Sequence, residues 1–155
     1  MKKGKNLYFI FLGILIGICI ITFLSFNLSQ IHYSLQFKVN GYTEANALAI
    51  CSNKNLEKTS ECLNSFVRGV YSYVPTSDSE RLDFNKIIEE GNDCRGYNFI
   101  YETLFHNLGI KTKKVIIDVS REDNIQYKHV FLIAYDENSY TLLDQRRIFV
   151  FKYER

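Results

Sequence analysis

The sequence has no tryptophan and a single proline, Pro75. It has no proline-rich or glycine-rich tract, no internal repeat and no low-complexity run, so nothing marks it as fibrous or compositionally disordered. The formal net charge is only +2 in 155 residues, and Lys2, Lys3 and Lys5 already place three positive charges at the N-terminal end. This charge gives no support for a nucleic-acid partner. A glycine-rich phosphate loop is also missing, which argues against a nucleotide site.

Spacings typical of metal sites are missing as well. The chain has four cysteines and three histidines, but no C-x2-C or H-x3-H pair. Structural zinc sites are usually built from such pairs. Cys51, Cys62, Cys94 and His129 could be counted as four ligands, yet their spacing argues against a shared metal. We therefore expect neither a metal ion nor a cofactor.

Aromatic residues are plentiful, with eleven tyrosines and twelve phenylalanines. They supply enough apolar bulk for a compact core from about 110 residues. The length allows one domain with additional segments. We divide the chain into an N-terminus at 1–6, a transmembrane helix at 7–27, a juxtamembrane segment at 28–44 and a domain at 45–155. The oligomeric state cannot be predicted from these features.

The segment from Leu7 to Phe26 is a run of twenty residues without a charge. As a helix rising 1.5 Å per residue it would span about 30 Å, the thickness of the hydrocarbon core of a bilayer. A cleaved signal peptide or a lipoprotein signal is the alternative, but no alanine for a cleavage site occurs before Ala45. The lysines before the run predict a cytoplasmic N-terminus and an extracytoplasmic domain. The sequence thus predicts a single-pass membrane protein.

Between this run and the middle of the chain, two kinds of pattern occur. Apolar and polar residues alternate from Ile31 to Val39, which predicts a strand, either at a sheet edge or in an extended stalk. Thr43 can cap a short helix, and a second helix is predicted up to Val74, followed by a polar linker at 76–81. Two cysteines in this region, at positions 51 and 62, either form a disulfide or remain two buried thiols.

The stretch Gly91–Tyr97 predicts a turn that leads directly into a helix. Gly91 suits the end of a short preceding helix, and Asn92 and Asp93 are turn and cap residues. Cys94 then falls in the first turn of a helix that Gly109 ends. The positive end of the helix dipole favours thiolate, so the pKa of this thiol should fall. A buried structural cysteine is the alternative, since that is the commoner fate of cysteine.

A thiolate nucleophile needs a base, and one of the three histidines can serve. His32 precedes the predicted domain, and His106 lies on the same helix as Cys94, about 18 Å further along its axis. His129 remains, in a strand predicted at 127–135. We expect it to act as the general base and acid.

A carboxylate is predicted beside that histidine. A turn at 136–139 leads to a return strand that ends at Asp144. Antiparallel pairing places residue 144 opposite residue 131, two positions from His129. Cys94, His129 and Asp144 therefore form a predicted catalytic triad, in which the carboxylate orients the imidazole. The alternative is an ordinary strand histidine and a turn aspartate.

These residues resemble the motifs of the transglutaminase-like superfamily. That family has a glycine shortly before Asp-Cys, then a helix, Leu-Gly-Ile and a strand, as in Gly91–Tyr97 and Leu108–Ile110 here. His129 and Asp144 match its histidine and aspartate motifs in order and rough spacing. The resemblance covers about residues 45–155 and implies an α+β, papain-like fold with the cysteine helix packed on an antiparallel sheet. It also implies a Cys-His-Asp triad.

The match to the family has departures. Phe131 and Leu142 stand where members often carry tryptophan, and Gln145 replaces a common proline. These changes leave the triad intact and bear on substrate preference. Arg146 and Arg147 could bind a substrate carboxylate, although a solvated strand end or a salt bridge is the more ordinary role.

The sequence thus predicts a membrane-anchored thiol enzyme that acts on amide bonds of proteins or peptides. Hydrolysis is favoured over crosslinking because neither an acyl-acceptor site nor a calcium site is evident. The backbone N–H of Cys94 is the predicted oxyanion donor, with Asn92 as a candidate for the second. The alternative is a catalytically silent binding or scaffold domain of the same fold.

Overall fold

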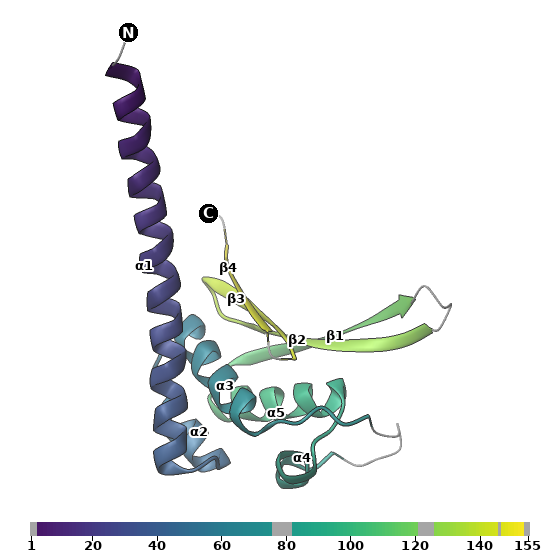
Figure 1. The fold of residues 1–155 in the computed structure, drawn as a ribbon. Helices are drawn as coiled ribbons and strands as arrows, with labels where there is room; N and C mark the ends of the chain where they lie inside the picture. Colours follow the sequence, from purple (N-terminus) through teal and green to yellow (C-terminus); the bar gives the residue numbers. More distant parts are fainter. Residues whose placement is uncertain (1–2, 76–81, 121–125, 146, 154–155) are drawn as a thin grey trace. The chain divides into compact units, whose positions relative to one another are not determined.

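The computed structural model describes residues 3–75, 82–120, 126–145 and 147–153. They form the α+β arrangement shown in Figure 1. Its elements are α1 (Lys3–Asn40), α2 (Glu44–Cys51), α3 (Leu56–Val70), α4 (Phe84–Glu90), α5 (Cys94–Asn107), β1 (Lys111–Ser120), β2 (Gln126–Tyr135), β3 (Ser139–Asp144) and β4 (Arg147–Lys152). The chain divides into two compact units, Met1–His32 and Tyr33–Arg155. The second unit contains every residue of the predicted triad.

The sheet of the second unit is antiparallel throughout, in the order β1-β2-β3-β4. The turn between β2 and β3 is held by Asp136, whose Oδ1 accepts hydrogen bonds from the N–H groups of Asn138 and Ser139, both at 2.8 Å. Leu132 pairs with Leu143, so the predicted register of these two strands is confirmed. The linker predicted at 76–81 lies outside the described residues.

Helix α5 packs against the sheet, mainly through β1 and β2 (Figure 1). Its buried positions follow the helical spacing that the sequence predicted, because one face of the helix covers the sheet. The largest of these buried side chains, together with those of the sheet, are Tyr97, Ile100, Tyr101, Leu104, Phe105, Leu132 and Leu143. The cysteine-bearing helix thus lies on an antiparallel sheet, as expected.

A disulfide joins α2 to α3. Cys51 and Cys62 are bonded, and both side chains are 0% exposed. The bond closes a short loop, and chain-entropy arguments assign such a loop about 3 kcal/mol of stabilisation. The question left open by the sequence is therefore decided in favour of the disulfide.

The strand predicted from Ile31 to Val39 is wrong, because α1 continues as a helix to Asn40. Tyr33 and Phe37 lie one helical turn apart, and both are buried in the core of the second unit. The ring of Phe37 contacts that of Phe66 at a centroid distance of 5.2 Å. Two buried aromatics four positions apart suit a helix, and this packing overrides the local alternation.

The transmembrane helix predicted at 7–27 is also wrong. In the part of the chain that the structure describes, no helix combines the length and apolar character needed to cross a bilayer. The apolar run is not a separate element, since α1 contains it and continues past Gln36 and Lys38. The single-pass topology and the membrane localisation, which depended on this segment, are corrected with it.

A tyrosine buried in the core, Tyr101, gives a prediction about stability at alkaline pH. Tyr101 is 1% exposed, and its hydroxyl donates a hydrogen bond of 2.9 Å to Oδ1 of Asn64. Burial raises the pKa of Tyr101 well above its ordinary value. The unfolded chain therefore loses this proton near pH 10 while the folded chain keeps it, so stability is full below pH 10 and falls as the pH rises further.

We expect Tyr101→Phe to lower the free energy of unfolding by about 1–2 kcal/mol at pH 7, since Asn64 loses its partner. Between pH 10 and pH 11 the free energy of unfolding should decrease less in Tyr101→Phe than in the wild type, by up to about 1.4 kcal/mol. Urea unfolding at these three pH values measures both effects. Tyr153→Phe, at a side chain that is 49% exposed, is the matched control. Equal alkaline losses in Tyr101→Phe and the wild type would contradict the prediction.

Candidate functional site

Helix α5 begins at Cys94, as predicted, because the residues before it cap it. The Asp93 side chain accepts a hydrogen bond of 2.8 Å from the N–H of Arg95. The Asn92 Oδ1 accepts one of 3.1 Å from the N–H of Gly96. A Cβ at Gly96 would lie 2.3 Å from the Cβ of Asn92, so this cap requires a glycine there. The local sequence thus determines where the cysteine sits on the helix.

The N–H of Cys94 itself is left for another partner. The next three N–H groups of α5 are used by the caps and by the carbonyl of Asp93, which accepts from Tyr97 at 3.2 Å. Within the described residues, the Cys94 N–H has no acceptor. It can therefore donate to an oxyanion formed beside the sulfur. Asn92, the candidate for a second donor, uses its side-chain oxygen to cap the helix, and its backbone N–H donates to the Ser72 carbonyl at 3.1 Å.

A short extended segment after α3 supports the loop that presents the cysteine. The helix predicted up to Val74 ends at Val70, and the segment then runs alongside Asn92. The N–H of Val74 donates to the Asn92 carbonyl at 2.9 Å, and the Tyr71 hydroxyl donates to the same carbonyl and to that of Asp93. Burial, and then the charge of Asp93, raise the pKa of Tyr71, so this hydroxyl stays protonated and remains a donor.

Gly91 makes this arrangement possible. It ends α4 with a φ of +82°, a conformation that favours glycine. A Cβ at this position would also lie 2.5 Å from the carbonyl oxygen of Ser72. The glycine that the sequence pattern placed at the end of a helix therefore also permits the extended segment to approach.

His129 and Asp144 are in direct contact. Nε2 of the histidine lies 2.7 Å from Oδ1 of the aspartate, and both side chains are partly buried. This is the diagonal contact between β2 and β3 that the register predicted. A carboxylate at Nε2 orients the ring and leaves Nδ1 as the nitrogen that can exchange a proton with a sulfur or a substrate.

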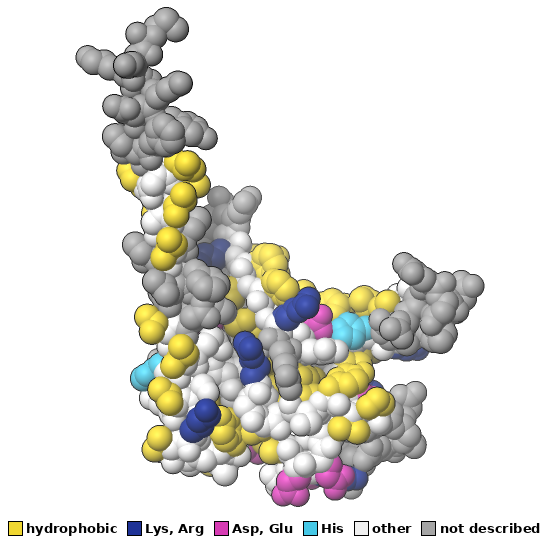
Figure 2. Space-filling model, viewed as in Figure 1, with side chains coloured by type: hydrophobic (Ala, Val, Ile, Leu, Met, Phe, Trp, Pro, Cys, Tyr) yellow, Lys and Arg dark blue, Asp and Glu magenta, His cyan; other side chains and the backbone are white. Residues whose placement is uncertain are grey.

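Cys94 and His129 share a cavity of about 540 Å3, which we term the thiol-side cavity. A second cavity of about 330 Å3, the aspartate-side cavity, contains Asp144. The first is lined by Tyr73, Asp93, Cys94, Val119, Lys128, His129 and Gln145, and the second by Tyr71, Tyr73, Tyr97, His129, Asp144, Gln145 and Arg147. His129, Tyr73 and Gln145 line both cavities, which therefore adjoin, and we refer to the pair as the cleft. A histidine, an acidic and a basic side chain gather on the face drawn in Figure 2.

The structure therefore joins His129 and Asp144 by a hydrogen bond and places Cys94 in a cavity that His129 also lines. Among the described residues, no hydrogen bond joins the Cys94 sulfur to the His129 ring. Such contacts are often long in enzymes without substrate and shorten when substrate binds.

Two residues shared by the cavities, Tyr73 and Gln145, were missed as functional residues. Tyr73 was placed in a helix, and only the pairing with Asn92 turns it toward the cleft. Gln145 has a φ of +50°, which is unusual for a residue with a side chain and costs about 1–2 kcal/mol. Backbone strain of this kind is common at functional sites. The departure from the family pattern at this position was the one signal in the sequence.

Asn98 ties the cysteine helix to the histidine strand. Its Nδ2 donates two hydrogen bonds of 2.8 Å, to the carbonyl of Cys94 and to the carbonyl of Val130, the residue after His129. The two carbonyl acceptors determine the orientation of the amide, since its oxygen would repel both. The side chain is 3% exposed, and its Oδ1 has no partner among the described residues. Asn98 thus connects the helix turn that carries Cys94 to the strand that carries His129.

We expect Asn98→Ala to lower the free energy of unfolding by about 1–3 kcal/mol, because two buried carbonyls lose their donor. Urea unfolding measures this loss. Asn107→Ala is the matched control, since its amide lies on the same helix and makes an exposed hydrogen bond of 2.7 Å to Glu44. Similar losses in both variants would show that the bridge contributes nothing beyond an ordinary surface contact.

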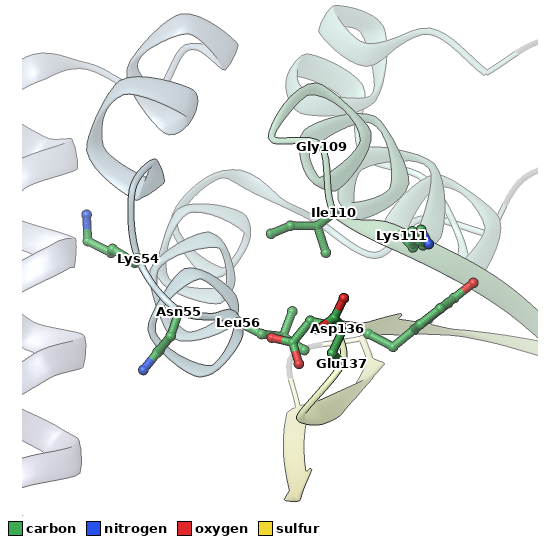
Figure 3. Close-up of a pocket in the computed structure, with 9 residues that line it drawn as sticks. Lys54, Asn55, Leu56, Gly109, Ile110, Lys111, Asp136 and Glu137 are labelled. Atoms are coloured by element: carbon green, nitrogen blue, oxygen red, sulfur yellow. The ribbon is translucent and has the colours of Figure 1, made fainter. Parts of the chain in front are cut away.

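A further hollow of about 410 Å3 lies at the opposite end of the sheet (Figure 3). Two of its charged groups are engaged locally, since Asp136 holds its turn and the Lys54 ammonium donates to the carbonyls of Ile50 and Ser52. His106 lines a neighbouring cavity at the same end, far along α5 from Cys94, as expected. In the described part of the chain, no group of three His, Cys, Asp or Glu side chains could hold a metal ion.

Comparison with known proteins does not assign the chain. No protein-family model matches the sequence, and no curated protein matches it. Its function must therefore be inferred from the fold and from the geometry of the cleft.

Proposed function

We propose that this protein is a thiol enzyme that acts on amide bonds of proteins or peptides through Cys94, His129 and Asp144. The observation that carries the proposal is the 2.7 Å contact between His129 Nε2 and Asp144 Oδ1, made by an imidazole that lines the same cavity as a cysteine at a helix start. A carboxylate, an imidazole and a thiol in this order are the components of a cysteine-enzyme triad. The transglutaminase-like motifs support the same chemistry.

The reaction has two steps. The Cys94 thiolate attacks the amide carbonyl, and the Cys94 N–H donates to the oxyanion. The C–N bond then breaks, His129 gives its Nδ1 proton to the leaving amine, and a thioester remains on the sulfur. In the second step His129 takes a proton from water, which attacks the thioester and releases a carboxylic acid. Asp144 accepts the Nε2 hydrogen bond throughout and stabilises the imidazolium.

Water is the proposed acceptor of the acyl group. A crosslinking enzyme would instead accept an amine, which attacks the same thioester. Both outcomes share the first step and differ in whether an acid or a new amide is released. Product analysis with and without an added primary amine therefore distinguishes hydrolysis from transfer without affecting the assignment of the triad.

The rival function is a binding domain of the same fold without turnover. The observation that favours it is that no hydrogen bond joins the Cys94 sulfur to the His129 ring within the described residues. A binding domain needs no contact between these groups. The two functions differ in the reactivity that they predict for the thiol.

The test uses the full chain with Cys19→Ser, in which the cysteines are Cys94 and the disulfide-bonded pair Cys51 and Cys62. We expect iodoacetamide to alkylate Cys94 faster than it alkylates the thiol of free glutathione. The substitution His129→Ala should slow the alkylation of Cys94. A panel of peptide and glutamine-containing amides should yield a thioester adduct on Cys94, detected by mass spectrometry. Alkylation no faster than that of glutathione, together with no adduct across the panel, would support the binding domain instead.

A further inference from the structure

We infer that the aspartate-side cavity binds a carboxylate on the amine half of the substrate, and that Arg147 recognises it. The preferred substrate is then an amide whose leaving amine is an amino acid with a free α-carboxylate, as at the C-terminus of a peptide. This inference rests on the proposed function, since it divides the substrate at the bond that Cys94 attacks.

The two cavities assign the two halves of the substrate. Of these two cavities, the thiol-side cavity is the one that Cys94 lines, so the acyl half, which becomes bonded to sulfur, lies there. The leaving amine takes its proton from His129, whose ring lines both cavities. Past the ring lies the aspartate-side cavity, in which the substituents of the departing amine are placed.

The charged side chains of the aspartate-side cavity indicate what it could bind. Its one carboxylate, Asp144, is engaged by His129 at 2.7 Å. The guanidinium of Arg147 forms no ion pair among the described residues, with Asp144 or any other carboxylate. A planar guanidinium can donate two parallel hydrogen bonds to a carboxylate. The cavity therefore presents an available cation beside the reacting imidazole.

The hairpin between β3 and β4 places the backbone of Arg147, an exposed residue, beside that of Asp144. Asp144 and Arg147 are partners across the hairpin, so the residue that orients His129 and the residue that faces the substrate are directly opposite each other. Gln145, with its φ of +50°, begins the turn between them. Arg147 is thus positioned by the same short hairpin that positions Asp144.

The thiol-side cavity has a cation too, but a less distinctive one. Lys128 lines it, and its cross-strand partner on β1 is Asp118. Arg147 also has a carboxylate opposite it, Asp144, but that carboxylate already accepts the hydrogen bond of His129 at 2.7 Å. Arg147 is therefore the more available of the two cations, which favours an anionic amine half. At about 330 Å3, the aspartate-side cavity is at the small end of ligand sites, which suits a group of one or two residues.

The test compares two substrates that differ only at the end of the leaving amine, one with a free C-terminal carboxylate and one with a C-terminal amide. The wild type should cleave the free acid with a kcat/KM about 10- to 100-fold higher, the range for a hydrogen bond to a charged group. In Arg147→Gln this ratio should fall to about one, and in Arg147→Lys to an intermediate value. Lys152→Gln, at the other end of β4, should keep the wild-type ratio. The ratio should also decrease as salt is added.

The outcomes separate the inference from the proposed function. Cleavage of both substrates at equal rates by the wild type would overturn the inference and leave the proposed function standing. A preference for the free acid that persists in Arg147→Gln would also overturn it, because another group would then be responsible. Cleavage of neither substrate, with no thioester adduct on Cys94, would overturn both.

Discussion

Replacing Cys94 with alanine is expected to lower kcat for amide cleavage by roughly 10^4- to 10^6-fold, the range seen when a covalent nucleophile is removed. Without the sulfur no thioester can form, and the remaining groups can only assist direct attack by water. Alanine retains the backbone N–H, so the oxyanion donor and the start of α5 should persist. The side chain is only partly buried, so the loss of stability should be small.

Steady-state cleavage of the best substrate of the panel, with the thioester adduct followed by mass spectrometry, measures this effect. Cys19→Ser is the matched control, since Cys19 lies outside the unit that contains the cleft and should not alter the rate. Activity of Cys94→Ala within tenfold of the wild type would refute the mechanism. Loss of activity accompanied by unfolding would be recognised from circular dichroism, and Cys94→Ser, which keeps nearly the same volume, would then replace it as the test.

Replacing Asp144 with asparagine is expected to lower kcat by about 10^2- to 10^4-fold, with a smaller effect on KM. Asparagine keeps the shape of the side chain but removes its charge, so the imidazolium that forms during attack loses its stabilising partner. The amide can also present an N–H to Nε2 of His129, which would select the wrong tautomer. The 2.7 Å contact predicts that this substitution affects the chemistry rather than substrate binding.

The rate of Cys94 alkylation should fall together with kcat, because both depend on the thiolate that the oriented imidazole stabilises. A purely structural role of Asp144 would lower stability and leave both rates of the folded protein unchanged. Glu137→Gln, at an exposed position in the turn between β2 and β3, at the other end of the sheet from the cleft, is the control and should not change either rate. Wild-type values of kcat in Asp144→Asn would show that the carboxylate does not orient the base.

Features that depend on neighbouring residues were predictable from the sequence. The cap residues Asn92 and Asp93 place Cys94 in the first turn of α5, because each hydrogen bond involved spans only two to four residues. The register of β2 and β3 follows from the length of their connecting turn, and it brings Asp144 to His129. The resemblance to the transglutaminase-like superfamily rests on these same local features, and it stays a prediction.

Features that depend on distant partners required the tertiary structure. The alternating segment that contains Tyr33 and Phe37 satisfies the pattern of a strand, and only burial against residues such as Phe66 makes it a helix. The extent of α1, from Lys3 to Asn40, also differs from the prediction, and among the described residues no helix is long and apolar enough to cross a bilayer. The end of α3 at Val70 is likewise decided by pairing with a loop twenty residues further on.

The start of α5 at Cys94 and the contact between Asp144 and His129 could be predicted from the sequence, since hydrogen bonds within a cap or a hairpin need no other partner. The tertiary structure alone decided what surrounds them. Tyr73, Asn98 and Arg147 enter the site through contacts between separate elements, whose free energies depend on burial and on the approach of distant chain segments. No local sequence pattern predicts such contacts, because tyrosine, asparagine and arginine also occur on solvated surfaces.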